Sequence, residues 1–593
     1  MKSRVTWDRP IEFIFSLLGY MVGLGNLWRF SYLCFRNGGG AFLIPYLLSV
    51  AVFGLPMYIF EIAIGQFTQR GKLNAWDRIP LMKGYGYGCI VMTTMSIVPY
   101  MLVMAWGIIY LYHSFTTHDL PWTVCDNAWN TEPCIAYNGW VSHTKYMNET
   151  NLFANETTPT DATINATYSD TSLAQAQFWR YYVLRLANNR NDFYGGFNWP
   201  MLICLAISYL SIIAITIKGI KSSGKVVYVT ATFPYVMIMV LLIRGLTLEG
   251  ALKGISTLLI PKFAELAKAQ VWIDAASQVL YTYAIGFASL TTFASYNHFN
   301  NNFYRQALIL VPVGAFTSVL MGLMTFSYLG HMAAMQGVEI DKILKTGPGL
   351  IFQVIPLGFS MLPFPQLWSV LFFVMFFFVA VDSVFSDFDA LVSTITDIFP
   401  KLKLTRGRKI LTNLGLGLFL FSISCSLLSN SGIYIFEFIF YYGASGIILL
   451  LLAFFESISV GWLWDVDQFA ADVKRMTGDQ LSVWFKLSYR YFIPVITSSI
   501  FLFYCVKWTP LKVADYTYPV WANVLGWALS LLSLLWIPGV FIYVLMNGRG
   551  SIKQRLAQGI ESKLADGEWN KTPKLTENDT EMEFRQNVIL TSI

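Results

Sequence analysis

Long apolar segments recur along the whole chain and limit the folds that it can adopt. Twelve segments of about 20 residues or more lie near residues 11–34, 41–66, 88–115, 198–217, 225–244, 272–296, 306–331, 366–396, 410–428, 433–460, 488–507 and 520–546. A helix of roughly 20 residues spans a bilayer, because it rises about 1.5 Å per residue. Charged residues make up only 13% of the 593, which excludes soluble domains and nucleic-acid binding. The chain is therefore predicted to be an all-α polytopic membrane protein with 12 transmembrane helices.

The distribution of basic residues predicts the orientation of these helices. They gather before the first segment, after the second, and in the loops that follow the fourth and the eighth: Arg4, Arg9, Arg70, Lys72, Arg78, Lys83, Lys218, Lys221, Lys225, Lys401, Lys403, Arg406, Arg408 and Lys409. All these loops share one side of the membrane, and the positive-inside rule makes that side cytoplasmic. We expect both termini in the cytoplasm and no cleavable signal peptide, because the first apolar segment is too long and lacks a cleavage site.

The loop at residues 116–199 is then expected outside the cell. It holds three glycosylation sequons, at Asn148, Asn155 and Asn165, and the closely spaced Cys125 and Cys134. Sequons also arise by chance, and two others stand in the polar C-terminal tail, but three in the largest outer loop favour glycosylation. An external loop is oxidised, so we expect a Cys125–Cys134 disulfide.

The first segment carries residues that a simple membrane anchor would lack. Gly19, Gly23 and Gly25 interrupt it, and Asn26 and Arg29 follow. Glycine destabilises a helix interior by about 1 kcal/mol relative to alanine, and arginine at membrane depth needs a cavity or a partner. Unwound backbone within a bilayer is tolerated where it lines a cavity, and its free N–H and C=O groups can bind ions and carboxylates.

A second interruption is expected in the sixth segment. Between Gln278 and Asn297, small residues alternate with aromatic and hydroxyl side chains around Gly286. Interrupted helices 1 and 6 predict a 5+5 inverted-repeat core with its site at the midplane. The alternative is that the small residues form ordinary packing faces. The predicted organisation is a cytoplasmic N-terminus (1–10), helices 1–5 (11–244), helices 6–10 (245–460), helices 11–12 (461–546) and a cytoplasmic tail (547–593).

Seven sequence motifs resemble those of the neurotransmitter sodium symporters, solute carrier family 6. They are GLGNLWRF followed by NGGGAFLIPY, PWTVCDNAWNT, WIDAASQVLYT with ASYNHFNNNFYR, TGPGLIFQVIP and VDSVFSDFD, in one order from about Arg4 to Met546. The resemblance implies a LeuT-like fold and transport of a substrate together with Na⁺ and Cl⁻. It also maps the ion and substrate sites of the family onto this chain.

The resemblance implies two sodium sites built from oxygen donors, as a hard cation requires. The second site maps to the carbonyls of Gly19, Val22 and Val379 and to the side chains of Asp382 and Ser383. The alternative for Asp382 is a structural, hydrogen-bonded acid. The first site maps to the Met21 carbonyl, Asn26 and Thr282, but Gly314 stands where the family has an asparagine ligand. A water molecule or the substrate carboxylate would replace that ligand, or the site is weak or lost.

Chloride in this family is held by hydroxyl and amide donors, which here would be Tyr46, Gln278, Thr282 and Ser318. The missing asparagine belongs to this site as well. Each of the four residues has an alternative role in an interhelical hydrogen bond.

The family's monoamine carriers place an aspartate where this chain has Gly23. A substrate carboxylate is expected there, bound by the N–H groups of Leu24 and Gly25, by sodium and by the Tyr100 hydroxyl. The other substrate positions map to Ser96, Tyr281, Ala284, Phe287, Ser383, Val384 and Asp387.

Asp387 is unusual, because this position is small or apolar in comparable family members. A carboxylate here favours a cationic or strongly polar substrate group through a charge-assisted hydrogen bond. The alternatives are that Asp387 joins a hydrogen-bond network, replaces a sodium ligand or exchanges protons.

The gates of the family map to Arg29 and the aromatic lid Phe287 on the outside, and to Arg4, Trp7 and Asp397 on the inside. The outer aspartate that pairs with Arg29 in the family is Phe440 here, and Glu437 one turn away is a possible replacement.

The predicted function is sodium-coupled, chloride-dependent import of a small-molecule amino acid across the plasma membrane by alternating access. No enzyme activity is expected, because the five histidines are scattered and no metal-ligand spacing appears. One alternative is a non-transporting receptor or leak channel on the same fold, and another is a betaine, GABA or glycine carrier. Substrate identity, ion stoichiometry and oligomeric state stay open.

Overall fold

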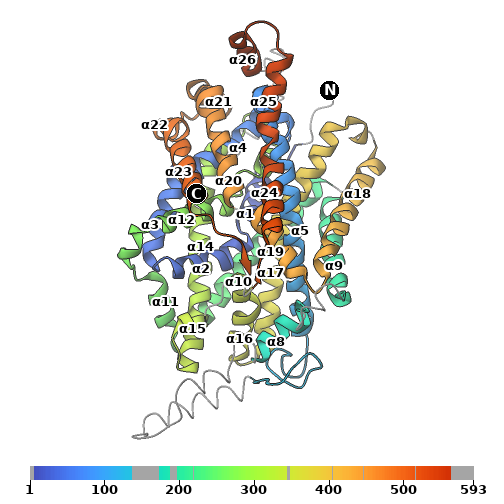
Figure 1. Ribbon diagram of the computed structural model, residues 1–593, viewed down its shortest axis with the longest axis vertical. Helices are drawn as coiled ribbons and strands as arrows, with labels where there is room; N and C mark the ends of the chain where they lie inside the picture. The colour runs from blue at the N-terminus through green and yellow to red at the C-terminus, as the bar shows by residue number, and fades with distance from the viewer. Residues whose placement is uncertain are drawn as a thin grey trace.

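The computed structural model describes residues 6–136, 173–186, 196–217, 219–343, 347–403, 405–444, 446–513 and 516–561. The three sequons and Arg4 lie outside these residues. Within them, most of the chain forms helices that run along the long axis of the molecule (Figure 1).

Most of the predicted spans form as expected. The helices of the predicted spans are, in order, α1 (Pro10–Met21) with η1 (Gly25–Arg29) and α2 (Phe30–Arg36); η2 (Gly40–Phe42), α3 (Leu43–Ser49), η3 (Val50–Gly54) and α4 (Leu55–Thr68); α5 (Lys83–Ser114); α9 (Trp199–Thr216); α10 (Ile220–Leu246); α12 (Ala269–Thr282) with α13 (Ser289–Ala294); α14 (Phe303–Gln336); α17 (Pro365–Ile398); α18 (Arg406–Ser424) with η11 (Cys425–Leu428); α19 (Gly432–Gly443) with α20 (Gly446–Ile458) and η12 (Ser459–Leu463); α22 (Val483–Leu487), η13 (Ser488–Phe492) and α23 (Ile493–Lys507); and α24 (Val520–Leu534) with α25 (Trp536–Asn547).

Shorter elements fill the described parts of the connections. They are η4 (Asn74–Arg78), η5 (Pro80–Met82), α8 (Ala174–Gln177), η6 (Phe178–Val183), α11 (Ala251–Leu259), η8 (Phe263–Ala267), α15 (Ile340–Ile343), η9 (Leu350–Val354), α16 (Ile355–Ser360), η10 (Pro400–Lys403), α21 (Val466–Thr477), β1 (Lys512–Val513), β2 (Tyr516–Thr517) and α26 (Ile552–Ile560). Strands β1 and β2 pair antiparallel.

Length and composition alone identify 9 spanning helices in the described part of the chain, or 11 if each of two bent pairs counts as one span. The remaining predicted span is the sixth, which is divided between α12 and the six-residue α13. Neither half is long enough to cross a bilayer alone. The all-α polytopic fold with interrupted helices is therefore confirmed.

The first span breaks after Met21, and its two halves differ in direction by 48°. The Asn26 side chain donates to the Met21 carbonyl across the break at 2.8 Å. This bond satisfies a carbonyl that an unbroken helix would have paired with a backbone N–H.

The sixth span breaks between Thr282 and Ser289. Gly286 lies in the left-handed region at φ 89°, and Ala284 and Ala288 do so at 49° and 55°. Such dihedrals cannot continue a right-handed helix. The freed Gly286 N–H donates to the Glu61 side chain at 2.7 Å, so α4 stabilises the break.

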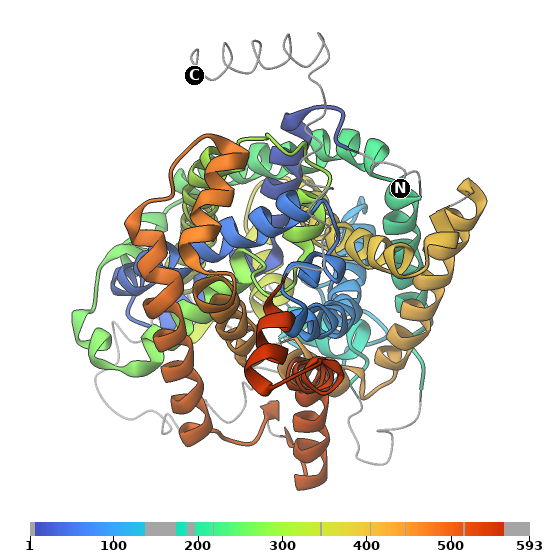
Figure 2. The ribbon, with the colours of Figure 1, turned by 90° about the horizontal axis from the view of Figure 1, so that it is seen from above.

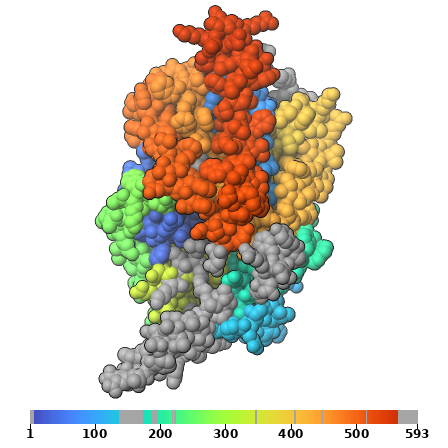
Figure 3. All heavy atoms as spheres, in the orientation of Figure 1, coloured from blue at the N-terminus to red at the C-terminus, as the bar shows by residue number. Residues whose placement is uncertain are grey.

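The helices of the core lie between less buried helices at the rim. In the span Gly40–Thr68, 72% of the most apolar 18-residue stretch is buried. The corresponding share is 28% in Gly407–Leu428 and 22% in Val483–Lys507. Figure 2 shows α18 and α24 at the edge of the bundle, and in Figure 3 α24 and α25 form a long exposed ridge. The exposed apolar side chains of these rim helices form a surface suited to lipid.

The two ends of the molecule carry different elements. Helices α21 and α26 lie at one end of Figure 1, and α8 and α16 lie at the other. The bridge Ile135–Leu173 joins the segment that follows Cys134 to the start of α8. The Cys125–Cys134 disulfide forms, with Cα atoms 5.9 Å apart, which confirms the predicted pairing.

Candidate functional site

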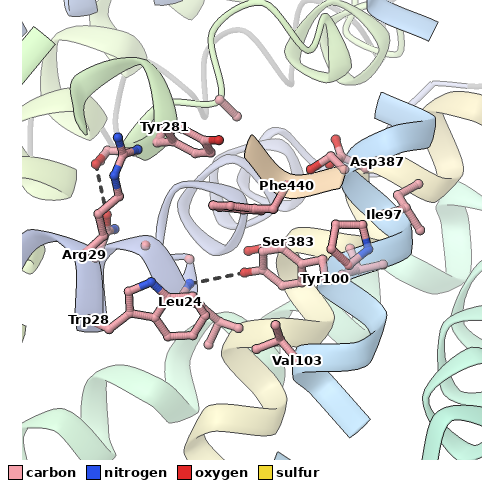
Figure 4. A pocket seen from close by; sticks show the side chains of 18 of the residues that line it. Leu24, Trp28, Arg29, Ile97, Tyr100, Val103, Tyr281, Ser383, Asp387 and Phe440 are labelled. Atoms are coloured by element: carbon pink, nitrogen blue, oxygen red, sulfur yellow. Dashed lines mark hydrogen bonds between the residues drawn. The ribbon is translucent and has the colours of Figure 1, made fainter. Parts of the chain in front are cut away.

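A cavity of about 190 Å³ lies where the two interrupted spans meet α5, α17 and α19 (Figure 4). Every position that the sequence predicted for substrate lies in its wall: Gly23, Leu24, Gly25, Ser96, Tyr100, Tyr281, Ala284, Phe287, Ser383, Val384 and Asp387. These residues come from distant parts of the chain, and the two breaks are what bring backbone groups to the cavity surface.

The break of the first span forms one wall with hydrogen-bonding groups. The Leu24 N–H donates to the Tyr100 hydroxyl at 3.2 Å. A Cβ atom on Gly23 would lie 3.2 Å from Ser383 Oγ and 3.6 Å from the Tyr100 hydroxyl. Gly23 thus allows the backbone to approach two hydroxyls closely, and N–H groups at a helix start suit an anion such as a carboxylate.

Asp387 places a carboxylate in the same cavity. Its Oδ1 accepts from the Tyr20 hydroxyl at 2.6 Å and from the Ser289 hydroxyl at 2.7 Å. The residue is 9% exposed. Asp387 therefore both lines the cavity and belongs to a hydrogen-bond network, and the two bonds leave Oδ2 for another partner.

The residues predicted for the second sodium site lie where the first span meets α17. Asp382 is 1% exposed, and its Oδ1 has no hydrogen-bond partner among the described residues. A Cβ atom on Gly19 would lie 2.5 Å from Asp382 Oδ2, so the broken first span comes directly against this carboxylate. Ser383 Oγ donates to the Val379 carbonyl at 3.3 Å. A buried carboxylate oxygen without a partner fits a small hard cation.

The residues predicted for the first sodium site bond to one another. Thr282 Oγ1 donates to Asn26 Oδ1 at 3.0 Å, and the Asn26 amide donates to the Met21 carbonyl. A Cβ atom on Gly314 would meet the Tyr283 ring at 3.2 Å and Met21 Sδ at 3.4 Å. Tyr283 and Met21 thus occupy the space beside Gly314, where the family has an asparagine, and the Tyr283 hydroxyl lies 3.7 Å from that Cβ position.

The four residues predicted for the chloride site form two bonded pairs. The Tyr46 hydroxyl donates to Ser318 Oγ at 3.2 Å, and the Gln278 amide donates to Thr282 Oγ1 at 3.3 Å. Gln278 Oε1 has no partner among the described residues. Thr282 links this group, through its bond to Asn26, to the residues predicted for the first sodium site.

An aromatic column lies beside Arg29 at the cavity wall. The guanidinium carbon lies 4.3 Å from the centre of the Tyr281 ring, and the Phe440 ring stacks on Tyr281 at 6.2 Å. Arg29 also donates to Ser277 Oγ at 3.0 Å. Among the described residues Arg29 forms no ion pair. Glu437 lines the cavity but does not pair with Arg29, so it does not act as the replacement partner in this structure.

The N-terminal segment packs against the second half of the sixth span. The Trp7 indole donates to the Phe293 carbonyl at 3.2 Å, and the Trp7 N–H donates to the Tyr296 carbonyl at 3.1 Å. These bonds hold the segment against the end of α13. Asp397 lies in the last turn of α17, and because Arg4 lies outside the described residues, their pairing stays a prediction.

Lys72 is a residue of this region that the sequence did not reveal. It stands among the basic residues of a loop that is predicted to be cytoplasmic, yet its side chain is 0% exposed. Its ammonium donates to Thr93 Oγ1 at 3.0 Å, to the Phe287 carbonyl at 3.2 Å and to Ser289 Oγ at 3.4 Å. Burial lowers the pKa of Lys72, and the charge of Asp387 raises it.

Comparisons with known proteins agree with the resemblance noted in the sequence. The model of the "Sodium:neurotransmitter symporter family" matches residues 4–548. A creatine transporter of Torpedo marmorata is 41% identical over 556 residues, covering 93% of this chain and 87% of that protein. The human "Sodium- and chloride-dependent creatine transporter 1" is 39% identical, covering 93% and 85%. The mouse "Sodium- and chloride-dependent GABA transporter 2" is 38% identical over 558 residues, covering 94% and 89%.

Proposed function

Because the chain belongs to the sodium:neurotransmitter symporter family, we propose that it imports a small zwitterion whose carboxylate and cationic group lie at opposite ends. The family consists of transporters, and the protein is not an enzyme. The finer proposal concerns the cargo, the ions that travel with it and the residues that recognise each.

The positions of the polar groups in the cavity support a long zwitterion. The carboxylate would bind between the Leu24 N–H, the Tyr100 hydroxyl and Ser383, and the cation would bind Asp387. Asp387 follows Ser383 by one turn of α17, a rise of about 6 Å. In an α-amino acid the two charged groups share one carbon atom and lie closer together than this. A distal amine, as in GABA or the side chain of lysine, reaches further and fits better, and so do the outer nitrogen atoms of the guanidinium group of creatine.

The observation that carries this proposal is the Asp387 carboxylate in the cavity wall, with both of its hydrogen bonds on Oδ1. A buried carboxylate with an oxygen that faces a cavity favours a cation. Relatives named as creatine and GABA transporters carry substrates of this charge pattern. They support the proposed class without deciding the cargo.

Sodium would bind at Asp382 and Ser383, with the carbonyls of Gly19, Val22 and Val379. The partnerless Asp382 Oδ1 supports this site. A second sodium ion at Met21, Asn26 and Thr282 would need the substrate carboxylate or a water molecule as a further ligand. Chloride would bind at Tyr46, Gln278, Thr282 and Ser318, and the relatives named as chloride-dependent support its role.

Transport of cargo would be coupled to sodium because the ions and the cargo bind next to one another at the two breaks. Sodium would favour the state that is open to the outside. Cargo would then close Phe287 and the aromatic column, and release of Trp7 and of the Arg4–Asp397 contact would open the inside. The sodium gradient does work in such a cycle because ion and substrate stabilise the same state. We place this cycle in the plasma membrane, with both termini in the cytoplasm.

The proposed role of Asp387 is tested by substrate preference in Asp387→Asn. We expect purified wild type in liposomes to take up creatine, GABA or lysine in preference to leucine. A charge-assisted hydrogen bond is worth about 1.5–3 kcal/mol, so the variant should lose about 10-fold or more of that preference. Asp467→Asn, at an exposed ion pair with Lys486, is the matched control. An unchanged preference in Asp387→Asn would remove Asp387 from substrate recognition.

Two alternative functions are compatible with this fold. A receptor or leak channel is suggested by Gly314 and Phe440, which depart from the family pattern, and it would bind cargo without concentrating it. A betaine or glycine carrier would share the mechanism, but its uptake would be indifferent to Asp387→Asn.

A further inference from the structure

The buried Lys72 ammonium lies directly behind the cavity wall. Lys72 follows the left-handed turn at Gln69 that ends α4, and it does not line the cavity. Its three acceptors come from α5, from the break of the sixth span and from the start of α13. Among the described residues no carboxylate lies within ion-pair distance of it. Lys72 is thus a cation held entirely by neutral groups.

One hydroxyl joins Lys72 to the cavity. Ser289 Oγ accepts from the Lys72 ammonium at 3.4 Å and donates to Asp387 Oδ1 at 2.7 Å. Ser289 is itself fully buried. The hydroxyl proton can serve only one acceptor, so the cation on one side orients it towards the carboxylate on the other.

We propose that Lys72 is a positioning residue for substrate specificity, which acts through Ser289 to hold Asp387 as a negative, fixed acceptor for the cationic end of the cargo. This inference rests on the proposed function and deepens it. It assigns the choice of cargo to a pair of opposite charges, of which only Asp387 touches the substrate.

The physical argument is that a buried carboxylate is unfavourable unless a positive charge compensates it. Among the described residues, the hydrogen-bond partners of Asp387 are the neutral hydroxyls of Tyr20 and Ser289. Lys72 supplies this charge from behind the wall, where charges interact strongly across low-dielectric protein. The charge of Asp387 raises the pKa of Lys72, as expected for a pair of opposite charges.

Glu61 is the competing partner for Lys72. It is buried on α4, and its Oε1 already accepts the Gly286 N–H at 2.7 Å. No hydrogen bond links Glu61 to Lys72 in the described structure, whereas Ser289 links Lys72 to Asp387. The pairing with Asp387 is therefore the one that the geometry favours, and the variants below separate the two.

The charge pair is tested first without any cargo, by the melting temperature of the purified protein. We expect Lys72→Met and Asp387→Asn each to lower it, because each leaves one buried charge uncompensated. The double variant Lys72→Met with Asp387→Asn should recover at least half of the summed loss, and Lys72→Met with Glu61→Gln should recover less. The control combines Lys83→Met with Asp387→Asn. Lys83 pairs with Asp77 at 2.6 Å, so the losses of melting temperature in this double variant should simply add.

Additive losses in the Lys72→Met, Asp387→Asn double variant would overturn the proposal. If Lys72→Met does not fold alone, recovery of folded protein in the double variant supports the pair, and failure of both overturns it. This result is independent of transport. Failure of creatine, GABA and lysine to bind the wild type would contradict the proposed function while leaving the charge pair to be judged by stability.

Specificity is then tested with GABA and pentanoate, in which a methyl group replaces the ammonium group of GABA. In sodium chloride, we expect GABA to inhibit binding of labelled GABA at least 10-fold better than pentanoate does in wild type. Lys72→Met should reduce this ratio at least 5-fold, as Asp387→Asn does, and Lys72→Arg should restore it. A lower melting temperature with an unchanged ratio in Lys72→Met would reduce Lys72 to a structural role and overturn the proposal.

Discussion

The Arg29 guanidinium lies against the face of Tyr281, 4.3 Å from the ring centre, and Tyr281 in turn stacks on Phe440. This column stands where family members close the outer entrance with an arginine–aspartate pair. The Tyr281 hydroxyl also donates to the Ala444 carbonyl, which ties α12 to the tenth span. A cation–π contact thus takes the place of an ion pair beside the cavity.

Replacing Tyr281 with leucine should weaken retention of cargo. The variant loses both the contact with Arg29 and the stack on Phe440, and a cation–π contact is worth about 0.5–2 kcal/mol. We therefore expect the apparent affinity for cargo in sodium to fall about 2- to 30-fold. Tyr281→Phe keeps the ring and loses only the hydroxyl, so it should stay close to wild type. Equal affinities in the two variants would show that the aromatic face does not hold the gate.

Replacing Gly19 with alanine should abolish stabilisation by sodium. The new Cβ atom would lie 2.5 Å from Asp382 Oδ2, which pushes the carboxylate away from the carbonyls that complete the site. A ligand at 100 times its dissociation constant stabilises a protein by about 2.7 kcal/mol. The melting temperature in sodium chloride relative to choline chloride measures this effect.

The matched control for that variant is Gly415→Ala on α18, where nothing lies within 4 Å of the new atom. Sodium chloride should raise its melting temperature by as much as it raises that of wild type. A normal increase in Gly19→Ala would mean that sodium does not bind between the first span and Asp382.

Removing the Cys125–Cys134 disulfide should lower stability without changing substrate preference. Closing a short loop of this kind contributes about 2–3 kcal/mol by restricting the unfolded chain, and the disulfide lies outside the cavity. Cys125→Ser, Cys134→Ser and the double variant should melt at similar, reduced temperatures. A change in the ratio of GABA to leucine uptake in these variants would contradict the separation of loop and site.

The interruptions could be read from the sequence because glycine and polar residues are exceptional within apolar spans. Gly19, Gly23 and Gly286 mark backbone that approaches side chains closely or adopts positive φ, and the structure has breaks at both places. The resemblance then supplied positions around the cavity that composition and periodicity could not have identified.

The contacts of Lys72 and Arg29 could not be predicted in the same way. Lys72 stands after a span, where a lysine normally marks the cytoplasmic surface. Its burial depends on the turn at Gln69 and on Ser289, far along the chain. The Arg29 contact likewise depends on which face of α12 turns towards α2. Such pairings follow from tertiary packing, which short-range sequence patterns do not encode.

Sodium-driven accumulation in liposomes tests the central claim most directly. Purified protein is reconstituted, an inward sodium gradient is imposed in chloride, and labelled GABA or creatine is followed. The account predicts that one of them accumulates inside above its external concentration, and that dissipating the gradient with a sodium ionophore releases it. Binding without accumulation, or uptake that only equilibrates and ignores the gradient, would contradict a symporter built on these two interrupted spans.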